Sequence, residues 1–353
     1  YNGNGHSISN LYYDSTSELI GLFLLIKDAE IKNVTLKNVN IKTTKYRVGG
    51  IAAQSNNCII DNCKVYGKIV ATGNRGVTGG SGSLVGGIVG YTSHETIIKN
   101  CINNADISGY SYAGGITGDL RSNSNVNNCI NYGKINSEGA STGGNCLGGI
   151  IGATGHNDES STTSIVTKCL NFGNVEGTNN YIGGIIGDAK CITNISECAN
   201  MNEITTTSTS TSARRIGGIV GNTTKGYVKN CYNTGKVYIN DEQKGTNIGG
   251  IVGTITNSGF EVSYCYNAGE VKSYNNTGGI VGNLSKTPTT AIENYYIGSK
   301  INNTLETGKN TEFGTPDVEN TIKSLYNKDT WNTFIKQNTN QNVNSGFPIF
   351  IWQ

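Results

Sequence analysis

Gly86-Gly87-Ile88-Val89-Gly90 is the stretch that decides the fold, because the chain contains it eight times, in full or with small changes. The eight copies begin at Gly49, Gly86, Gly114, Gly148, Gly183, Gly217, Gly249 and Gly278. From one first glycine to the next, the step runs from 28 residues (114 − 86) to 37 residues (86 − 49). A period in this range is the signature of a repeat architecture, in which each unit packs against its neighbours.

A second phrase follows in each unit, with the pattern apolar-x-x-Cys-x-Asn-x-Gly-x-apolar, as in residues 228–237. Its cysteine recurs at Cys63, Cys101, Cys129, Cys169, Cys198, Cys231 and Cys265. Its asparagine recurs at Asn103, Asn131, Asn171, Asn200, Asn233 and Asn267. Equivalent residues of stacked coils lie about 4.8 Å apart, so we expect one column of each type. The outermost units differ, with Val65 in place of the asparagine and Tyr295 in place of the cysteine.

Each unit contains three short apolar segments: the Gly-Gly-Ile phrase, the segment that ends at the cysteine, and the segment after the next glycine. Glycine and asparagine separate these segments, and both suit turns that need a positive φ. Three short strands joined by tight turns form one coil of a parallel β-helix. We therefore predict an all-β fold, a right-handed parallel β-helix (solenoid) over residues 1–295, with one coil of about 28–40 residues per repeat. The right hand is the one that parallel crossovers favour.

Residues 296–353 are predicted to form a small C-terminal cap. Thr315-Pro316-Asp317 is typical of a helix start, with Thr315 as the N-cap and Pro316 at the first position, so we expect a short helix to about Asn327. Large apolar side chains follow at Trp331, Phe334, Phe347, Pro348, Phe350 and Trp352. We expect them to close the open end of the core, because a solenoid needs its end covered.

The composition argues against several classes of function. Charged residues make up 15% of the chain and the formal net charge is +2, whereas ordinary domains are roughly 25% charged. A nucleic-acid-binding surface needs clustered basic residues, but the longest basic run is Arg214-Arg215. The most apolar run, residues 19–26, is far shorter than the roughly 20 residues of a membrane span. We expect no nucleic-acid partner and no membrane insertion, and we interpret the start in mid-phrase at Tyr1 as that of a piece of a larger protein.

These phrases resemble a known family of repeats. The Gly-Gly-Ile-Val-Gly copies are similar to the GLUG motif of bacterial surface proteins, found in large adhesin-like proteins of Gram-positive bacteria and Bacteroides and beside IgA-cleaving metallopeptidase domains. The stretches NGNGHSISNL (2–11) and GFPIFIW (346–352) resemble the segments that precede and close such repeats. The resemblance implies an extracellular, bacterial cell-surface location and other domains in the same parent chain. It transfers no catalytic residue.

The cysteines and asparagines are predicted to be structural. Parallel side chains in a column are poorly oriented for a disulfide, so we expect buried free thiols that act as small apolar core residues. Stacked asparagine amides can hydrogen-bond along the rod. Three cysteines lie off the column, and their pairing is left open: Cys58, Cys146 and Cys191. The sequence has no Cys-x-x-Cys, and His6, His94 and His156 match no ligand spacing, so we expect no metal and no cofactor.

The sequence lacks two common catalytic signatures. His94-Glu95 is not followed by the second histidine of His-Glu-x-x-His, and we expect residues 80–83 to form a loop and not a Gly-x-Ser-x-Gly elbow. Carboxylates could pair in a groove, as in β-helix polysaccharide hydrolases and lyases. However, Asp158-Glu159, Asp188 and Asp241-Glu242 lie in different linkers and do not recur in register. We therefore predict that the chain is not an enzyme, with a carbohydrate-active β-helix enzyme as the alternative.

Tyrosine is the residue type that suggests binding, because exposed aromatic rings with polar neighbours suit contacts with sugars or proteins. We predict four ligand-binding residues in or beside the linkers: Tyr110, Tyr112, Tyr181 and Tyr227. The alternative for these rings is packing that shields the edges of the coils. The predicted function is a non-catalytic adhesin or ligand-presenting stalk whose partner is a host glycan or a matrix protein. A structural spacer without a ligand is the remaining alternative.

Overall fold

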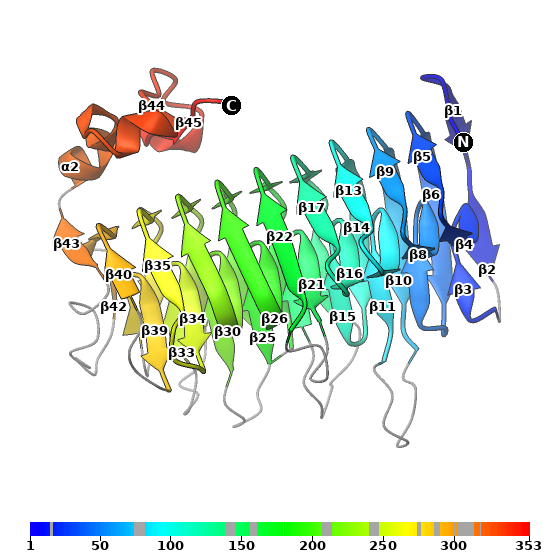
Figure 1. The fold of residues 1–353 in the computed structure, drawn as a ribbon, viewed down its shortest axis with the longest axis horizontal. Helices are drawn as coiled ribbons and strands as arrows, with labels where there is room; N and C mark the ends of the chain where they lie inside the picture. Colours follow the sequence, from blue (N-terminus) through cyan, green and yellow to red (C-terminus); the bar gives the residue numbers. More distant parts are fainter. Residues whose placement is uncertain are drawn as a thin grey trace.

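The computed structural model describes residues 1–14, 17–73, 82–137, 146–155, 161–178, 180–206, 214–239, 247–273, 277–285, 290–298, 301–302, 314–317 and 319–353. The chain winds into coils that stack side by side from the amino-terminal coil to the last coil (Figure 1). Strands pair with the equivalent strands of the neighbouring coils, and these pairings are parallel. The predicted all-β parallel solenoid is therefore confirmed.

Three sheets run along the stack. The first sheet has nine strands: β3 (Leu19–Ile20), β7 (Arg47–Gly49), β11 (Leu84–Gly86), β15 (Tyr112–Gly114), β20 (Cys146–Gly148), β25 (Tyr181–Gly183), β29 (Arg215–Gly217), β33 (Asn247–Gly249) and β38 (Thr277–Gly278). Each of its strands after β3 ends at the first glycine of the Gly-Gly-Ile phrase of its coil, and β3 ends just before Gly21.

The second sheet has two rows of strands, which β26 (Ile186–Ser196) and β30 (Val220–Lys229) join because each of them crosses both rows. The first row also contains β4 (Phe23–Lys27), β8 (Ala52–Asn56), β12 (Val89–Ser93), β16 (Thr117–Leu120), β21 (Ile151–Thr154), β34 (Val252–Ile255) and β39 (Val281–Leu284). The second row also contains β5 (Glu30–Lys32), β9 (Ile59–Asp61), β13 (Ile97–Lys99), β17 (Asn125–Asn127), β22 (Thr163–Thr167), β35 (Glu261–Ser263) and β40 (Thr290–Ile292).

The third sheet begins with β1 (Ser7–Ser9), β2 (Tyr12–Asp14), β6 (Thr35–Thr43), β10 (Lys64–Ala71) and β14 (Ile102–Gly109). It then continues as two rows. One row holds β18 (Ile130–Asn131), β23 (Leu170–Asn171), β27 (Ala199–Asn200), β31 (Tyr232–Asn233), β36 (Tyr266–Asn267), β41 (Tyr295–Ile297) and β43 (Thr315–Asp317). The other row holds β19 (Ile135–Ser137), β24 (Val175–Gly177), β28 (Ile204–Thr206), β32 (Val237–Ile239), β37 (Val271–Lys272) and β42 (Ile301–Asn302).

The core lies inside the coils and follows the repeated phrases. Val85, Ile88, Ile98, Cys101 and Ile107 are all buried in one coil, and the equivalent residues of the other coils belong to the same apolar cluster. Stacking the coils therefore buries one continuous core that no single coil could form alone.

The Gly-Gly-Ile phrase forms a corner between two strands, not the strand that we expected. Gly86 ends β11, Gly87 and Ile88 turn, and Val89 begins β12. A Cβ on Gly86 would lie 2.1 Å from the carbonyl oxygen of Val89, and a Cβ on Gly87 would lie 2.2 Å from the carbonyl oxygen of Gly115. Glycine is thus needed here for the close approach of backbones, and not for a positive φ.

The positive φ occurs at another corner, directly before the cysteine. Asn62, Asn100, Asn128 and Asn230 all have φ between 50° and 55°. The left-handed conformation is tolerated best by glycine and asparagine. This explains why asparagine recurs at the position before the cysteine.

The last coil differs from the sequence prediction by one position. Tyr295 pairs in register with Tyr266, the residue after Cys265, so Asn294 occupies the cysteine position. Asn294 Oδ1 accepts a hydrogen bond of 3.0 Å from the backbone N–H of Cys265. The amide oxygen thus does what a sulfur does in an earlier coil, where the N–H of Cys63 contacts Cys101 Sγ.

The C-terminal segment, residues 319–353, contains one α-helix, α2 (Glu319–Lys323), three short 3-10 turns, η2 (Leu325–Asn327), η3 (Trp331–Thr333) and η4 (Asn344–Gly346), and an antiparallel pair, β44 (Ile335–Lys336) and β45 (Ile349–Phe350). The expected helix start at Thr315 is wrong, because residues 315–317 form strand β43. This strand pairs with β41 at the edge of the third sheet, where a proline is tolerated.

The C-terminal segment does not sit across the end of the core as expected. It lies on the outer side of the third sheet, where Trp331 and Phe350 form a second apolar cluster with Leu170, Tyr232 and Tyr266. In Figure 1 it folds back over the upper flank of the stack. The outward residues after the cysteines are apolar in these coils, which gives the segment a surface to pack on. None of the helices among the described residues combines the length and apolar character needed to cross a lipid bilayer.

Candidate functional site

The cysteine column is a structural element of the core. All seven column cysteines are buried, and the ten cysteines of the chain are free. Cys101 Sγ donates weakly to the carbonyl oxygens of Lys99 (3.2 Å) and Ile60 (3.7 Å). Burial raises the pKa of the Cys101 thiol well above its ordinary value. A buried thiol that stays protonated is a poor nucleophile and a poor metal ligand.

The asparagine column is a continuous ladder of hydrogen bonds. The Nδ2 group of each asparagine donates to Oδ1 of the next: Asn103 to Asn131, Asn131 to Asn171, Asn171 to Asn200, Asn200 to Asn233 and Asn233 to Asn267, at 2.7–2.8 Å. Val65 and Tyr296 stand at the two ends of the column. Each Nδ2 group also donates to a backbone carbonyl two residues ahead, as Asn171 does to Gly173 (2.8 Å). The amides are therefore occupied within the fold.

Two of the predicted tyrosines lie in a seam between the first sheet and the first row of the second sheet. We call it the polar seam and define it by Tyr112, Asp119, Arg121, Cys146, Tyr181, Asp188, Lys190, Arg215 and Asn222. Tyr112, Cys146 and Tyr181 follow one another in register on β15, β20 and β25. Cys146, one of the off-column thiols, is thus enclosed between two tyrosines.

The charges of the polar seam are paired with one another. Lys190 Nζ donates to the Tyr112 hydroxyl (2.6 Å) and lies 3.9 Å from Asp188 Oδ2. Asn222 Nδ2 donates to Asp188 Oδ1 (2.7 Å), and Arg215 donates to Asn222 Oδ1 (2.7 Å). Burial raises the pKa of Asp188 and outweighs the opposing effect of Lys190 and Asn222. Burial also raises the pKa of Tyr112. The seam is therefore a closed network between the two sheets.

The polar seam corrects one expectation about carboxylates. Asp119 and Asp188 share a register column, with Ala153 between them, although we expected no recurrence in register. Both carboxylates are buried, and Arg121 Nε lies 2.7 Å from Asp119 Oδ2. Both residues lie on strands directly after a Gly-Gly-Ile phrase, Asp119 on β16 and Asp188 on β26, so the expectation that Asp188 lies in a linker is wrong. Asp158-Glu159 and Asp241-Glu242 lie outside the described residues.

The four predicted tyrosines do not form one site. Tyr112 is buried (7% exposed) and Tyr181 is half-buried, two coils further along the polar seam. Tyr110 lies in the turn between β14 and β15, where its N–H donates to Ser83 Oγ (2.7 Å). Tyr227 lies on β30 in the second row of the second sheet, with Lys229 Nζ 4.7 Å from its ring centre. The structure therefore places the four rings in three separate regions.

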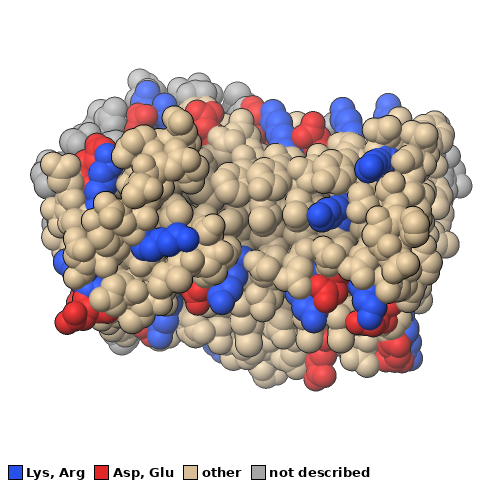
Figure 2. Space-filling view, turned by 90° about the horizontal axis from the view of Figure 1, so that it is seen from above, with Lys and Arg blue, Asp and Glu red and all other residues tan. Residues whose placement is uncertain are grey.

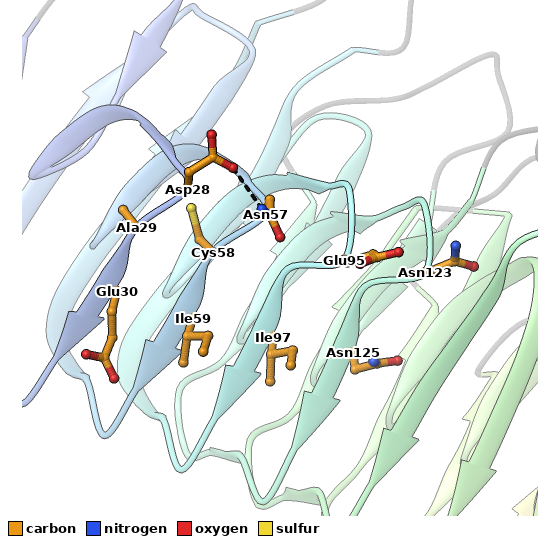
Figure 3. Close-up of a pocket in the computed structure, with 10 residues that line it drawn as sticks. All are labelled: Asp28, Ala29, Glu30, Asn57, Cys58, Ile59, Glu95, Ile97, Asn123 and Asn125. Carbon is orange, nitrogen blue, oxygen red and sulfur yellow. Dashed lines mark hydrogen bonds between the residues drawn. The ribbon is translucent and has the colours of Figure 1, made fainter.

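A first groove, of about 610 Å³, crosses the corner between the two rows of the second sheet near the amino-terminal end (Figure 3). Asp28, Glu30 and Glu95 are acidic residues along it, and Asn57 Nδ2 donates to Asp28 Oδ1 (2.8 Å). Figure 3 shows Asp28 and Glu30 on one coil with their carboxylates pointing apart, and Glu95 on another coil. Among the described residues, no group of three or more His, Cys, Asp or Glu is arranged to hold a metal ion.

A second groove, of about 600 Å³, lies between the third sheet and the C-terminal segment, and we call it the aromatic groove. Its floor includes Tyr132 and Phe172, whose rings stack with centres 5.0 Å apart and planes 9° apart. Trp352 lines the opposite side and stacks on Phe350 with an angle of 10°. The remaining lining is mainly uncharged: Asn128, Ile130, Leu170, Gln337, Asn338, Thr339, Asn340, Val343, Ile349 and Gln353, with Lys336 as the one basic side chain.

Sequence reasoning missed the aromatic groove, although a signal for it exists. Tyr66, Tyr132 and Phe172 all stand three residues after a column cysteine, so the register alone puts them on the outer side of the third sheet. The predicted binding tyrosines lie in or beside the linkers, whereas these three positions lie in the repeated phrase itself. The partner wall comes from residues 336–353, whose docking place no repeat could indicate.

Comparisons with known proteins agree with the repeat. A family model described as the GLUG motif matches residues 212–238, which include Gly217–Gly221 and the phrase around Cys231. A comparison with curated proteins found no match, and neither did a comparison with solved structures. The chain therefore contains a GLUG motif at residues 212–238, which is consistent with the GLUG-repeat region that its Gly-Gly-Ile-Val-Gly phrases predicted.

Proposed function

We propose that the chain is a non-catalytic module of a larger bacterial protein, displayed outside the cell at its surface, where it acts as an adhesin or a ligand-presenting stalk. A GLUG-motif region folded as a solenoid fits a repeat module of a larger protein. The host glycan or matrix protein that such a module would hold is a partner of the coil exterior, because the interior is filled by side chains.

The proposal rests on the contrast between the buried reactive groups of the core and the exposed aromatic ring of the groove. The groups with chemical reactivity in the described core, the column thiols and the carboxylates Asp119 and Asp188, are buried and occupied in structural contacts. In contrast, Tyr132 is 49% exposed in a groove that has few charges. Solvent-exposed aromatic rings in a concave site support binding more than catalysis.

The proposal is tested with a binding screen on the purified chain. We expect saturable binding to at least one immobilised host glycan or matrix protein, and labelling of the parent protein on intact cells by an antibody against this chain. Binding to neither class of ligand would favour a spacer that only sets distance. Antibody labelling only after the cells are broken would contradict the surface location.

A second candidate function, a carbohydrate-active enzyme, rests on Asp119 and Asp188. Two coils separate them, so they stand about 9.6 Å apart along the stack, near the upper limit of about 9.5 Å for the carboxylate pair of an inverting glycosidase. Release of reducing sugar from a polysaccharide by the wild-type chain, and its loss in Asp188→Asn, would overturn the non-catalytic proposal. We expect no release from either protein.

A further inference from the structure

The aromatic groove offers an apolar platform on the outside of the solenoid, made by the rings of Tyr132 and Phe172. The two residues come from neighbouring coils, and the register of β18 and β23 holds their rings parallel and stacked on one another. Phe172 is half-buried, because it also packs against the second apolar cluster. The platform is therefore preorganised, and binding need not fix the rings at a cost in entropy.

The wall that faces the platform carries carboxamides and hydroxyls. Gln337, Thr339 and Asn340 are exposed there. The loop that holds them is fixed by Asn338, whose Nδ2 group donates to the carbonyl oxygens of Val343 (2.6 Å) and Phe347 (3.1 Å). Amides both donate and accept hydrogen bonds, and hydroxyls do the same. The wall is therefore suited to a ligand that carries many hydroxyl groups.

The small number of charges in the aromatic groove limits the class of ligand that it can bind. Lys336 is the one basic residue in the lining, and its ammonium donates to the carbonyl oxygen of Ile351 (3.1 Å). No Asp or Glu side chain is among the described lining residues. The face that carries the C-terminal segment likewise has few charges along its middle, and charged side chains gather at its long edges (Figure 2). A nucleic acid or an anionic polymer would need a basic track.

We infer that the aromatic groove binds a short stretch of an uncharged glycan, an inference that rests on the proposed function and names its ligand class. Sugar rings have an apolar C–H face and a rim of hydroxyl groups. A C–H face packs on the exposed part of the Tyr132 ring, and the hydroxyl groups bond to Gln337, Thr339 and Asn340. The volume of about 600 Å³ lies within the range of small-ligand sites, roughly 300–1,000 Å³.

The experiment titrates the full chain by calorimetry with cellohexaose, maltohexaose and hexa-N-acetylchitohexaose as neutral probes, and with a heparin hexasaccharide as the anionic probe. We expect saturable binding of at least one neutral probe and none of heparin. Tyr132→Ala should weaken this binding about tenfold, equal to about 1.4 kcal/mol. Tyr132 is half exposed, so its removal leaves the core intact, and circular dichroism verifies this.

Tyr66→Ala is the matched control. Tyr66 is 38% exposed, on the same outer column of the third sheet but two coils away from Tyr132, and does not line the groove. We expect its affinity to equal that of the wild type. A second variant, Gln337→Ala with Thr339→Ala, removes wall groups without touching the platform, and we expect it to bind more weakly too.

The outcomes separate this inference from the proposed function. If the binding screen finds a ligand but Tyr132→Ala binds it as the wild type does, the groove assignment fails and the adhesin proposal stands. The groove assignment also fails, and the adhesin proposal also stands, if the ligand that binds is a matrix protein or the heparin hexasaccharide. If the screen and all four probes give no binding, both the inference and the proposed function are overturned.

Discussion

A single asparagine of the ladder completes two bonds, so one substitution breaks both. Asn171 donates to Asn200 and accepts from Asn131, each at 2.8 Å. Asn171→Ala leaves both neighbours with a buried polar group that lacks its partner, and each such group costs about 1–3 kcal/mol. We expect the free energy of unfolding, measured by urea titration, to fall by about 2–5 kcal/mol.

The control for this change is Asn104→Ala. Asn104 lies on β14 next to Asn103 but points outward and is partly exposed. Surface substitutions of this kind usually change stability by less than about 0.5 kcal/mol. Equal unfolding midpoints for the two variants would show that the ladder adds nothing to stability.

The Cys101 thiol makes stability depend on pH. Cys101 stays protonated in the folded chain, because burial raises its pKa, whereas in the unfolded chain it ionises near its ordinary pKa of about 8.5. The unfolded state therefore loses a proton that the folded state keeps. The contribution is fully present below about pH 8.5 and is lost as pH rises above it, by up to about 1.4 kcal/mol per pH unit.

Cys101→Val tests this dependence, because Val34 occupies the equivalent position in the first coil. Urea unfolding of both proteins at pH 8.5 and 9.5, in reducing buffer, gives the two slopes. We expect the slope of the variant over this interval to be smaller by about 1 kcal/mol per pH unit, because half of the unfolded-state thiols are already ionised at about pH 8.5. Identical slopes would mean that the Cys101 thiol titrates in the same way in both states.

Among the elements, the C-terminal segment packs on the third sheet through the second apolar cluster, in which Trp331 is the largest side chain. Trp331 is fully buried and packs against the rings of Tyr264, Tyr266 and Tyr295. Trp331→Ala removes about 3–5 kcal/mol of packing. Because the second apolar cluster is separate from the core of the coils, we expect the segment to detach while the solenoid stays folded.

Hydrogen exchange measures this separation. In Trp331→Ala the amides of residues 319–353 should lose protection, and those of β26 and β30 should keep it, since local unfolding follows cooperative units. Loss of protection through all three sheets would show that the segment and the coils unfold as one unit. Ile351→Ala, at a 49% exposed position of the same segment, serves as the control that changes neither.

The sequence was sufficient to predict the coil, but not the docking of the C-terminal segment on the coils. The repeated cysteine and asparagine predict their columns, because one repeat of the sequence forms one coil, so equivalent positions of neighbouring coils pair in register. The corner at Gly86-Gly87-Ile88 was mistaken for a strand, because glycine indicates close backbone approach without saying on which side. The docking of Trp331 and the meeting of Tyr132 with Trp352 depend on contacts between a repeat and a segment outside it, and no pattern within the chain encodes such contacts.

For the molecule as a whole, burial protects every thiol at once. All ten cysteines are buried and free. We expect the native chain to react with none of its thiols when treated with an aromatic disulfide reagent, and with ten of them after denaturation in guanidinium. Rapid labelling of even one thiol in the native chain would show that the stack opens locally at that thiol, and mass spectrometry would identify the coil that contains it.

The position of the aromatic groove along the stack has a consequence for how such a protein can change. The groove uses two neighbouring coils and the C-terminal segment, while other coils extend from it toward the amino-terminal end. Adding or removing one whole coil on that side would shift the groove by about 4.8 Å without altering any residue that lines it. The number of coils thus sets how far the groove lies from the amino-terminal end, and the residues of the groove set which ligand is bound. Duplication of one repeat in the gene can change this distance without changing the ligand.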